Sequence, residues 1–140
     1  MPPPHSHPGW PLGSAAARVF SHPGRPQGSW AIDSLLDSGA DDSVFPEAFG
    51  AKIGLDLRHA PQGRATGATL AGVPLRYAQV ILRLTDGREF REWPAWVGFT
   101  SVPLTYPMLG FAGFLQFFNA YLLGDHEEVE LTVNRLYPGS

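Results

Sequence analysis

The residues with the clearest chemical potential are Asp37, Ser38 and Gly39, which follow the apolar pair Leu35 and Leu36. A tight turn here leaves the Asp37 carboxylate bare at the end of a strand, and the glycine lets another backbone come close. One carboxylate cannot activate a water and protonate a carbonyl oxygen at the same time. Two carboxyl groups about 3 Å apart can, because they share one proton. The chain contains one Asp-Ser-Gly triplet, so we expect the second aspartate to come from another copy of the chain.

Other interpretations of the nearby acids stay open. Asp33 lies on the same side of the predicted strand as Asp37, but no glycine follows it, so its chain turns less easily. Asp37 could also be a turn-forming aspartate without a catalytic role, since Asp-Ser-Gly favours turns. Asp41 and Asp42 either line the same cleft or are solvated acids near the start of a helix.

Length and composition favour one domain with its own core. The chain has 140 residues, of which 44% are hydrophobic and 16% charged, and the low charge suggests that a partner subunit covers part of the surface. The net charge is -3, and aromatic residues do not alternate with Lys and Arg, which disfavours a nucleic-acid partner. The absence of cysteine excludes disulfides, thiolate metal sites and cysteine nucleophiles.

The N-terminus lacks the basic and apolar regions of a secretory signal, so we expect a cytoplasmic protein. The apolar stretch 108–123 is shorter than the roughly 18–20 residues that span a bilayer, and we predict that it belongs to the core, with no membrane partner. His5 and His7 could hold a metal. No acidic or further histidine ligand lies nearby, so we predict a solvated tail there and no metal site.

Turn-forming residues divide the chain into a proline-rich irregular arm (1–13), a single domain (14–136) and a tail (137–140). Apolar patterning predicts strands at 15–20, 29–36, 73–84, 89–97, 120–123 and 129–133. Asp86-Gly87 is a strong hairpin signal. Short helical pieces are expected at 43–53 and 111–118. The sequence therefore predicts an all-β barrel or sandwich of about seven to nine short strands with one or two short helices.

The ten residues 35–44, Leu-Leu-Asp-Ser-Gly-Ala-Asp-Asp-Ser-Val, closely resemble the active-site loop of retropepsin-like aspartic proteases, the retroviral protease group and its bacterial single-lobe relatives. Three further features follow in the family's order. The stretch 66–69 and the strand after it resemble a flap, and 95–98 resembles the strand that ends in a glycine. Met108-Leu109-Gly110 and the residues after it resemble the element that braces the active-site loop and the C-terminal helix.

The resemblance implies a closed acid-protease-type barrel that acts as a homodimer and an aspartic endopeptidase. The Asp37 of each subunit would be catalytic and would activate a water. Ser38, Gly39 and Gly110 would support the active-site loop. An extended peptide substrate would contact residues of the cleft, the flap and an apolar subsite, namely Ala40, Asp41, Asp42, Gly67, Ala68, Thr69 and Met108. No metal or organic cofactor is needed.

One departure from the family lies directly after Gly110. Many members have an arginine there, which usually pairs with the acidic residue at the Asp41 position, whereas this chain has Phe111. Asp41 is therefore expected to lack that partner. This departure supports an alternative function, a catalytically weak or inactive protease-like module that binds or dimerises.

Overall fold

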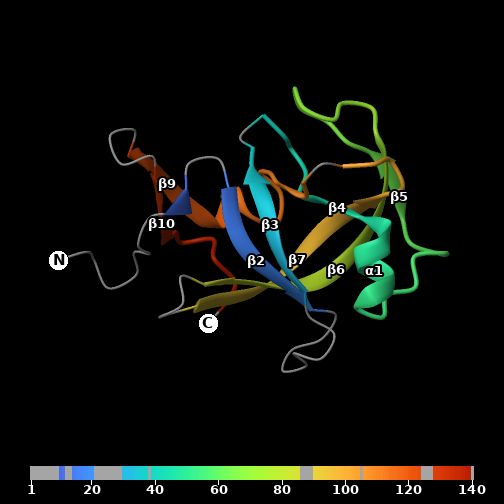
Figure 1. Cartoon of the computed structure of the whole chain (residues 1–140), viewed down its shortest axis with the longest axis horizontal. Helices are drawn as coiled ribbons and strands as arrows, with labels where there is room; N and C mark the ends of the chain where they lie inside the picture. Colours follow the sequence, from blue (N-terminus) through green and yellow to red (C-terminus); the bar gives the residue numbers. More distant parts are fainter. Residues whose placement is uncertain are drawn as a thin grey trace.

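A computed structural model describes residues 10–11, 14–20, 30–37, 39–85, 90–104, 106–123 and 128–139 (Figure 1). Within these residues the chain forms ten strands, one short α-helix and one turn of 3-10 helix. The prediction of a mostly β protein is confirmed. The larger sheet is a curled half-barrel, and α1 (Glu47–Lys52) lies at one end of the molecule, opposite β9 and β10.

The strands form two sheets. The first contains β2 (Ser14–Phe20), β3 (Trp30–Leu36), β8 (Met108–Leu109), β4 (Val44–Pro46), β7 (Phe90–Thr100), β6 (Pro74–Thr85) and β5 (Gln62–Arg64), in that order. β2 also pairs with β6, and this second pairing curls the sheet. The smaller sheet has the order β1 (Trp10–Pro11), β10 (Glu128–Val133) and β9 (Phe118–Leu123).

The long β6–β7 hairpin supplies much of the core. Its antiparallel register runs from Arg76 opposite Phe99 to Thr85 opposite Phe90. Alternate side chains point to one face, as the period of a strand requires, and they are buried there. These buried residues are Val80, Leu82, Leu84, Trp93, Ala95, Val97 and Phe99. The predicted turn at Asp86-Gly87 lies outside the described residues.

The two-residue strand β8 positions the candidate site. It runs parallel to β3, with Leu35 opposite Met108 and Leu36 opposite Leu109. On its other side it pairs with β4, where Val44 lies opposite Met108. β8 therefore lies between two strands that are close in sequence, and its Leu109 is fully buried there.

Three predicted boundaries differ from the structure. The helical piece at 43–53 splits into β4 and α1, because the ψ of 142° at Pro46 keeps that residue extended. The helix predicted at 111–118 is reduced to a 3-10 turn at Leu115–Phe117, since Gly113 has a φ of +85° that breaks a regular helix. Within the predicted irregular arm, Trp10–Pro11 forms β1 and pairs with β10; the other residues of the arm are outside the described part.

The tail at 137–140 is not a free end at Tyr137. The Tyr137 hydroxyl donates a 3.1 Å hydrogen bond to the Glu92 carbonyl, and the ring packs edge-on against Trp93. Burial raises the pKa of this hydroxyl above its ordinary value. None of the helices in the described ranges has the length and apolar character needed to cross a membrane.

Candidate functional site

Asp37 is fixed at the end of β3 by three short contacts. Its N–H donates to the Leu109 carbonyl at 3.1 Å, which continues the β3–β8 pairing into the turn. Its Oδ1 accepts the Gly39 N–H at 2.8 Å, and its carbonyl accepts the Ala40 N–H at 3.2 Å. The carboxylate is therefore held on a tight turn and stays partly exposed. Ser38, predicted to support this loop, lies outside the described residues.

The stretch after the turn is braced on one side by residues 110–112. The Phe111 N–H donates to the Ala40 carbonyl at 2.9 Å, and the Ala112 N–H donates to the Asp41 carbonyl at 2.8 Å. Gly110 is buried where a side chain would not fit, because a Cβ atom would lie 2.2 Å from the Asp42 carbonyl oxygen. The predicted contact between Gly110 and the loop is thus present, and it depends on backbone groups.

The other side of the stretch is covered by the tip of the β5–β6 hairpin, residues 66–69. The Ala68 N–H donates to the Gly39 carbonyl at 2.7 Å, and the Asp41 N–H donates to the Thr66 carbonyl at 3.2 Å. These two bonds flank an antiparallel pair formed by Ala40 and Gly67. The structure thus brings the predicted flap residues onto the predicted active-site loop.

Ser43 is a supporting residue that the sequence did not indicate. Its side chain is 1% exposed. The hydroxyl donates to the Ala112 carbonyl at 2.8 Å and accepts the Gly110 N–H at 3.2 Å. It therefore ties the start of β4 to the segment after β8. The only local signal is a serine directly before two buried apolar residues, which alone does not identify its distant partners.

The two acids next to the loop are held by Thr66. Its hydroxyl donates to Asp41 Oδ2 at 2.8 Å, so Asp41 has a hydrogen-bond donor from the tip. Its N–H donates to Asp42 Oδ2 at 3.4 Å. Desolvation raises the pKa of Asp42, and the neighbouring Asp41 charge raises it further. The Asp42 charge in turn contributes to the raised pKa of Tyr77, although desolvation is the main cause there.

The remaining predicted residues also lie around the turn. The position that a Cβ of Gly39 would occupy is 3.1 Å from Asp37 Oδ1, 3.3 Å from Thr69 Oγ1 and 3.7 Å from Ala68 Cβ. Met108 is half-buried in β8, beside Leu35 of the strand that carries Asp37. All the predicted site residues that the structure describes therefore belong to one cluster.

No protein-family model matches the sequence, and no match is found among curated proteins.

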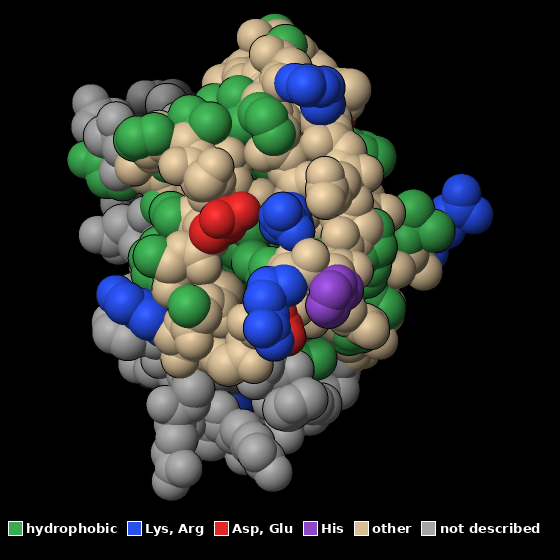
Figure 2. Space-filling model, turned by 90° about the vertical axis from the view of Figure 1, so that its right-hand side faces the viewer, with side chains coloured by type: hydrophobic (Ala, Val, Ile, Leu, Met, Phe, Trp, Pro, Cys, Tyr) green, Lys and Arg blue, Asp and Glu red, His purple; other side chains and the backbone are tan. Residues whose placement is uncertain are grey.

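A groove of about 1130 Å³ lies elsewhere, between α1, β5 and β6. Figure 2 shows this face, where basic side chains gather beside acidic ones. None of its lining residues belongs to the Asp37 turn or the 66–69 tip. They are Glu47, Ala51, Leu55, Asp56, Leu57, Arg58, Gln62, Gly63, Arg64, Pro74, Leu75, Arg76 and Ser101.

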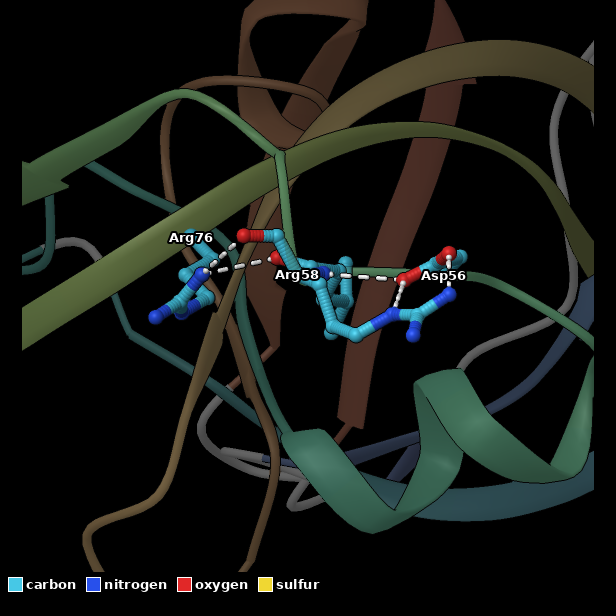
Figure 3. Close-up of polar contacts among 4 residues, drawn as sticks. Asp56, Arg58 and Arg76 are labelled. Atoms are coloured by element: carbon cyan, nitrogen blue, oxygen red, sulfur yellow. Dashed lines mark hydrogen bonds and ion pairs between the residues drawn. The ribbon is translucent and has the colours of Figure 1, made fainter.

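The charged side chains of this groove contact one another and the backbone (Figure 3). Arg58 forms a 2.8 Å ion pair with Asp56. Arg76 Nη1 donates to the Leu57 and Arg58 carbonyls at 2.8 and 3.1 Å. These contacts tie the connection between α1 and β5 to β6, which gives the arginines a structural role. Within the described residues, no cluster of three or more His, Asp or Glu side chains could hold a metal.

Proposed function

We propose that the protein is an aspartic endopeptidase that acts as a homodimer, with one Asp37 from each subunit. The observation that carries this proposal is the position of Asp37. It lies at the end of β3, on a turn that hydrogen bonds with Leu109 and Gly39 hold in place and that leaves the carboxylate partly exposed. Rigid support of a reacting group is what a catalytic site requires, because small displacements weaken catalysis strongly.

In the proposed dimer the two Asp37 carboxyl groups lie about 3 Å apart and share one proton, since two carboxyl groups this close cannot both ionise. The ionised carboxylate takes a proton from a water, whose oxygen attacks the carbonyl carbon of the peptide bond. The protonated carboxyl group donates its proton to the carbonyl oxygen. The carboxyl group that took the water's proton then gives it to the nitrogen, the C–N bond breaks and the amine leaves. One hydroxyl of the intermediate returns its proton to the other Asp37 as the carboxylic acid product forms. The titration belongs to the pair of groups.

The proposed substrate is a peptide in extended conformation. Gly39 and Asp41 present a carbonyl and an N–H on the same side of the chain, which is the pattern that pairs with an added strand. Because both subunits must contribute the same loop, the proposed interface is isologous, with Ser38 holding the two loops together across the two-fold axis. Met108 would contribute an apolar subsite. The proposed barrel is of the acid-protease type, needs no cofactor and acts in the cytoplasm.

The substitution Asp37→Asn tests this function. It keeps the shape of the side chain and its acceptor oxygen for the Gly39 N–H, but it removes the titratable group. Cleavage of a broad peptide library between about pH 4 and 7 is expected to fall at least a hundredfold, the loss typical of removing an acid–base group. Analytical ultracentrifugation is expected to give the same dimer for both forms.

Asp56→Asn is the matched control, because Asp56 is exposed and pairs with Arg58 away from the turn. It is expected to leave cleavage unchanged. If the wild-type protein cleaves no peptide of the library, or if Asp37→Asn cleaves as well as the wild type, the proposed function is wrong. Retained peptide binding without cleavage would favour the binding module.

A further inference from the structure

Residues 39–41 of the loop that carries Asp37 have backbone groups that could pair with an added strand. In this structure the 66–69 tip of the β5–β6 hairpin pairs with them. The Gly39 carbonyl and the Asp41 N–H pair with the tip, whereas the Ala40 and Asp41 carbonyls pair with Phe111 and Ala112 on the other side. Residues 39–41 are therefore paired on both sides, and the side that faces the tip has the carbonyl and N–H spacing that an antiparallel strand needs. Residues 66–68 lie where an added strand would lie, and they form the two ladder bonds that flank the pair of Ala40 and Gly67.

One side chain and one further backbone group reinforce this pairing. The Thr66 hydroxyl donates to Asp41 Oδ2 at 2.8 Å, and the Thr69 N–H adds a 3.3 Å bond to the Gly39 carbonyl. The Thr69 hydroxyl and Asp37 Oδ1 lie within 3.3 Å of one common point beside Gly39. The Thr69 side chain of the tip therefore lies near the Asp37 turn, beside the paired backbone.

Gly67 allows this close approach. Its φ is +100°, and a Cβ there would lie 2.4 Å from the Gly39 carbonyl oxygen and 2.9 Å from the Asp41 nitrogen. Gly72, in the same hairpin but outside the tip, also has a positive φ of +83°, and among the described residues no atom would lie within 4 Å of its Cβ. Both glycines therefore have a positive φ, but only Gly67 lies against residues 39–41.

The hairpin that carries the tip has a small buried cluster of its own, separate from the main core. A small buried cluster joins Ala65 and Leu75 of the hairpin to Val44, and Leu70 and Val73 pack against it. The main core contains none of these residues. A hairpin with its own small cluster can open at lower free energy than the whole molecule, because little apolar surface is lost.

We propose that the 66–69 tip is an autoinhibitory strand. It pairs with residues 39–41 in the free protein, and it must leave this edge before an extended peptide can bind. The inference rests on the proposed function insofar as the peptide is a substrate. A peptide then binds only the open fraction of molecules, which weakens its apparent affinity by that fraction.

The first experiment compares Gly67→Ala with Gly72→Ala by hydrogen exchange of backbone amides, measured by NMR on the whole chain. In the wild type, the Ala68 and Asp41 amides are expected to be protected. Gly67→Ala is expected to speed their exchange at least about tenfold, because the new Cβ forces the tip from the loop. Gly72→Ala is expected to leave both protected. Unprotected Ala68 and Asp41 amides in the wild type would overturn the inference.

The second experiment measures binding of a peptide library whose central bond is reduced to CH2–NH and cannot be cleaved. Gly67→Ala is expected to bind about tenfold more tightly than the wild type and Gly72→Ala. Thr66→Val, which removes only the hydroxyl donor to Asp41, is expected to shift affinity the same way by about threefold. Thr132→Val on β10 is its control and is expected to bind like the wild type.

The outcomes separate the inference from the proposed function. If the wild type cleaves peptides but Gly67→Ala binds no more tightly than Gly72→Ala, the autoinhibitory strand is wrong and the function stands. If Gly67→Ala binds more tightly but no form cleaves, the strand is supported and the function is wrong. If no form binds any peptide of the library, the inference is overturned.

Discussion

At the scale of single residues, two adjacent acids differ in how their charge is accommodated. Asp41 is exposed and accepts the Thr66 hydroxyl at 2.8 Å. Asp42 is partly buried, and desolvation together with the Asp41 charge raises its pKa. A raised carboxyl pKa means that the folded state binds the proton more readily than the unfolded chain. Stability from this group is therefore fully present at low pH, below its ordinary pKa of 3.8, and is lost as the pH rises through the raised value.

We predict that Asp42→Asn stabilises the protein at neutral pH. The substitution removes a charge that is costly to desolvate, and the amide oxygen can still accept the Thr66 N–H. The gain is expected to be about 0.5 kcal/mol, because solvent screens a partly exposed group. Urea unfolding at pH 7 and at pH 3 measures it, and the gain should vanish at pH 3.

Asp56→Asn is the control of opposite sign. Hydrogen bonds from Arg58 lower the pKa of Asp56, so this group stabilises the fold above its ordinary pKa and loses that effect as the pH falls. We expect a small loss of stability at pH 7 that disappears in acid. If Asp42→Asn lowers the free energy of unfolding at neutral pH, desolvation of the Asp42 charge does not destabilise the fold.

Residue-scale prediction from sequence succeeds where the signal is local. Asp37 and Gly39 lie two positions apart, and their turn follows from residue types that favour turns. The role of Thr66 does not follow in this way, because its hydroxyl reaches an acid 25 residues away. The sequence shows that Phe111 follows Gly110, where the resemblance predicts an arginine that pairs with Asp41, but it does not show that Thr66 donates to Asp41.

At the scale of elements, the site depends on the pairing of β4 with β8. The buried Ser43 hydroxyl, directly before β4, joins it to the segment after β8 through the buried Gly110 and the half-buried Ala112. We predict that Ser43→Ala destabilises the protein by about 2 kcal/mol, since the buried Gly110 N–H and the half-buried Ala112 carbonyl lose their partner. Urea unfolding measures this loss, and the slope of the transition should stay the same.

Ser101→Ala is the matched control, because Ser101 is exposed. It is expected to change stability by less than about 0.5 kcal/mol. An equal effect of the two substitutions would mean that the Ser43 hydroxyl does not stabilise the attachment of β4 to the segment after β8.

Strands could be predicted from the sequence where apolar and polar residues alternate over many positions. The β6–β7 hairpin follows from two alternating runs around a turn signal, and both strands are present. Shorter signals were ambiguous. The aromatic run after Gly113 fits a helix by composition, but the positive φ of that glycine and the antiparallel pairing of β9 override it.

At the scale of the whole molecule, the C-terminal residues fasten the smaller sheet to the main core. Tyr137 packs against Trp93 of β7 and Phe118 of β9, with ring centroids 5.8 and 5.9 Å away. The Trp93 indole N–H in turn donates to the Gly113 carbonyl at 2.8 Å. The last described residues are thus part of the packed structure.

We predict that Tyr137→Ala lowers the free energy of unfolding by about 2 kcal/mol, because it removes a half-buried ring and its bond to Glu92. Thermal and urea unfolding measure the change. Leu136→Ala is the control, since Leu136 is 56% exposed, and it is expected to change stability by less than about 0.5 kcal/mol. If both variants unfold like the wild type, the C-terminal residues do not fasten the two sheets.

The overall arrangement was only partly predictable. A mostly β fold follows from many short strands with turn signals between them. The order of the strands does not, because β8 is two residues long and pairs in parallel with a strand far back in the chain. A two-residue strand has no periodicity to read, and its place between β3 and β4 is set by tertiary packing.

The insertion of β8 between β3 and β4 also has a consequence for the order of folding. The hydroxyl of Ser43 joins groups that are 67 and 69 residues away in sequence, whereas β6 and β7 meet through a short connection. Closing a long loop costs more chain entropy than closing a short one, so distant pairings form slowly. The β6–β7 hairpin is therefore expected to form early. The Asp37 turn completes only after the chain beyond Gly110 has been synthesised, so a shorter nascent chain carries the aspartate without the frame that holds it.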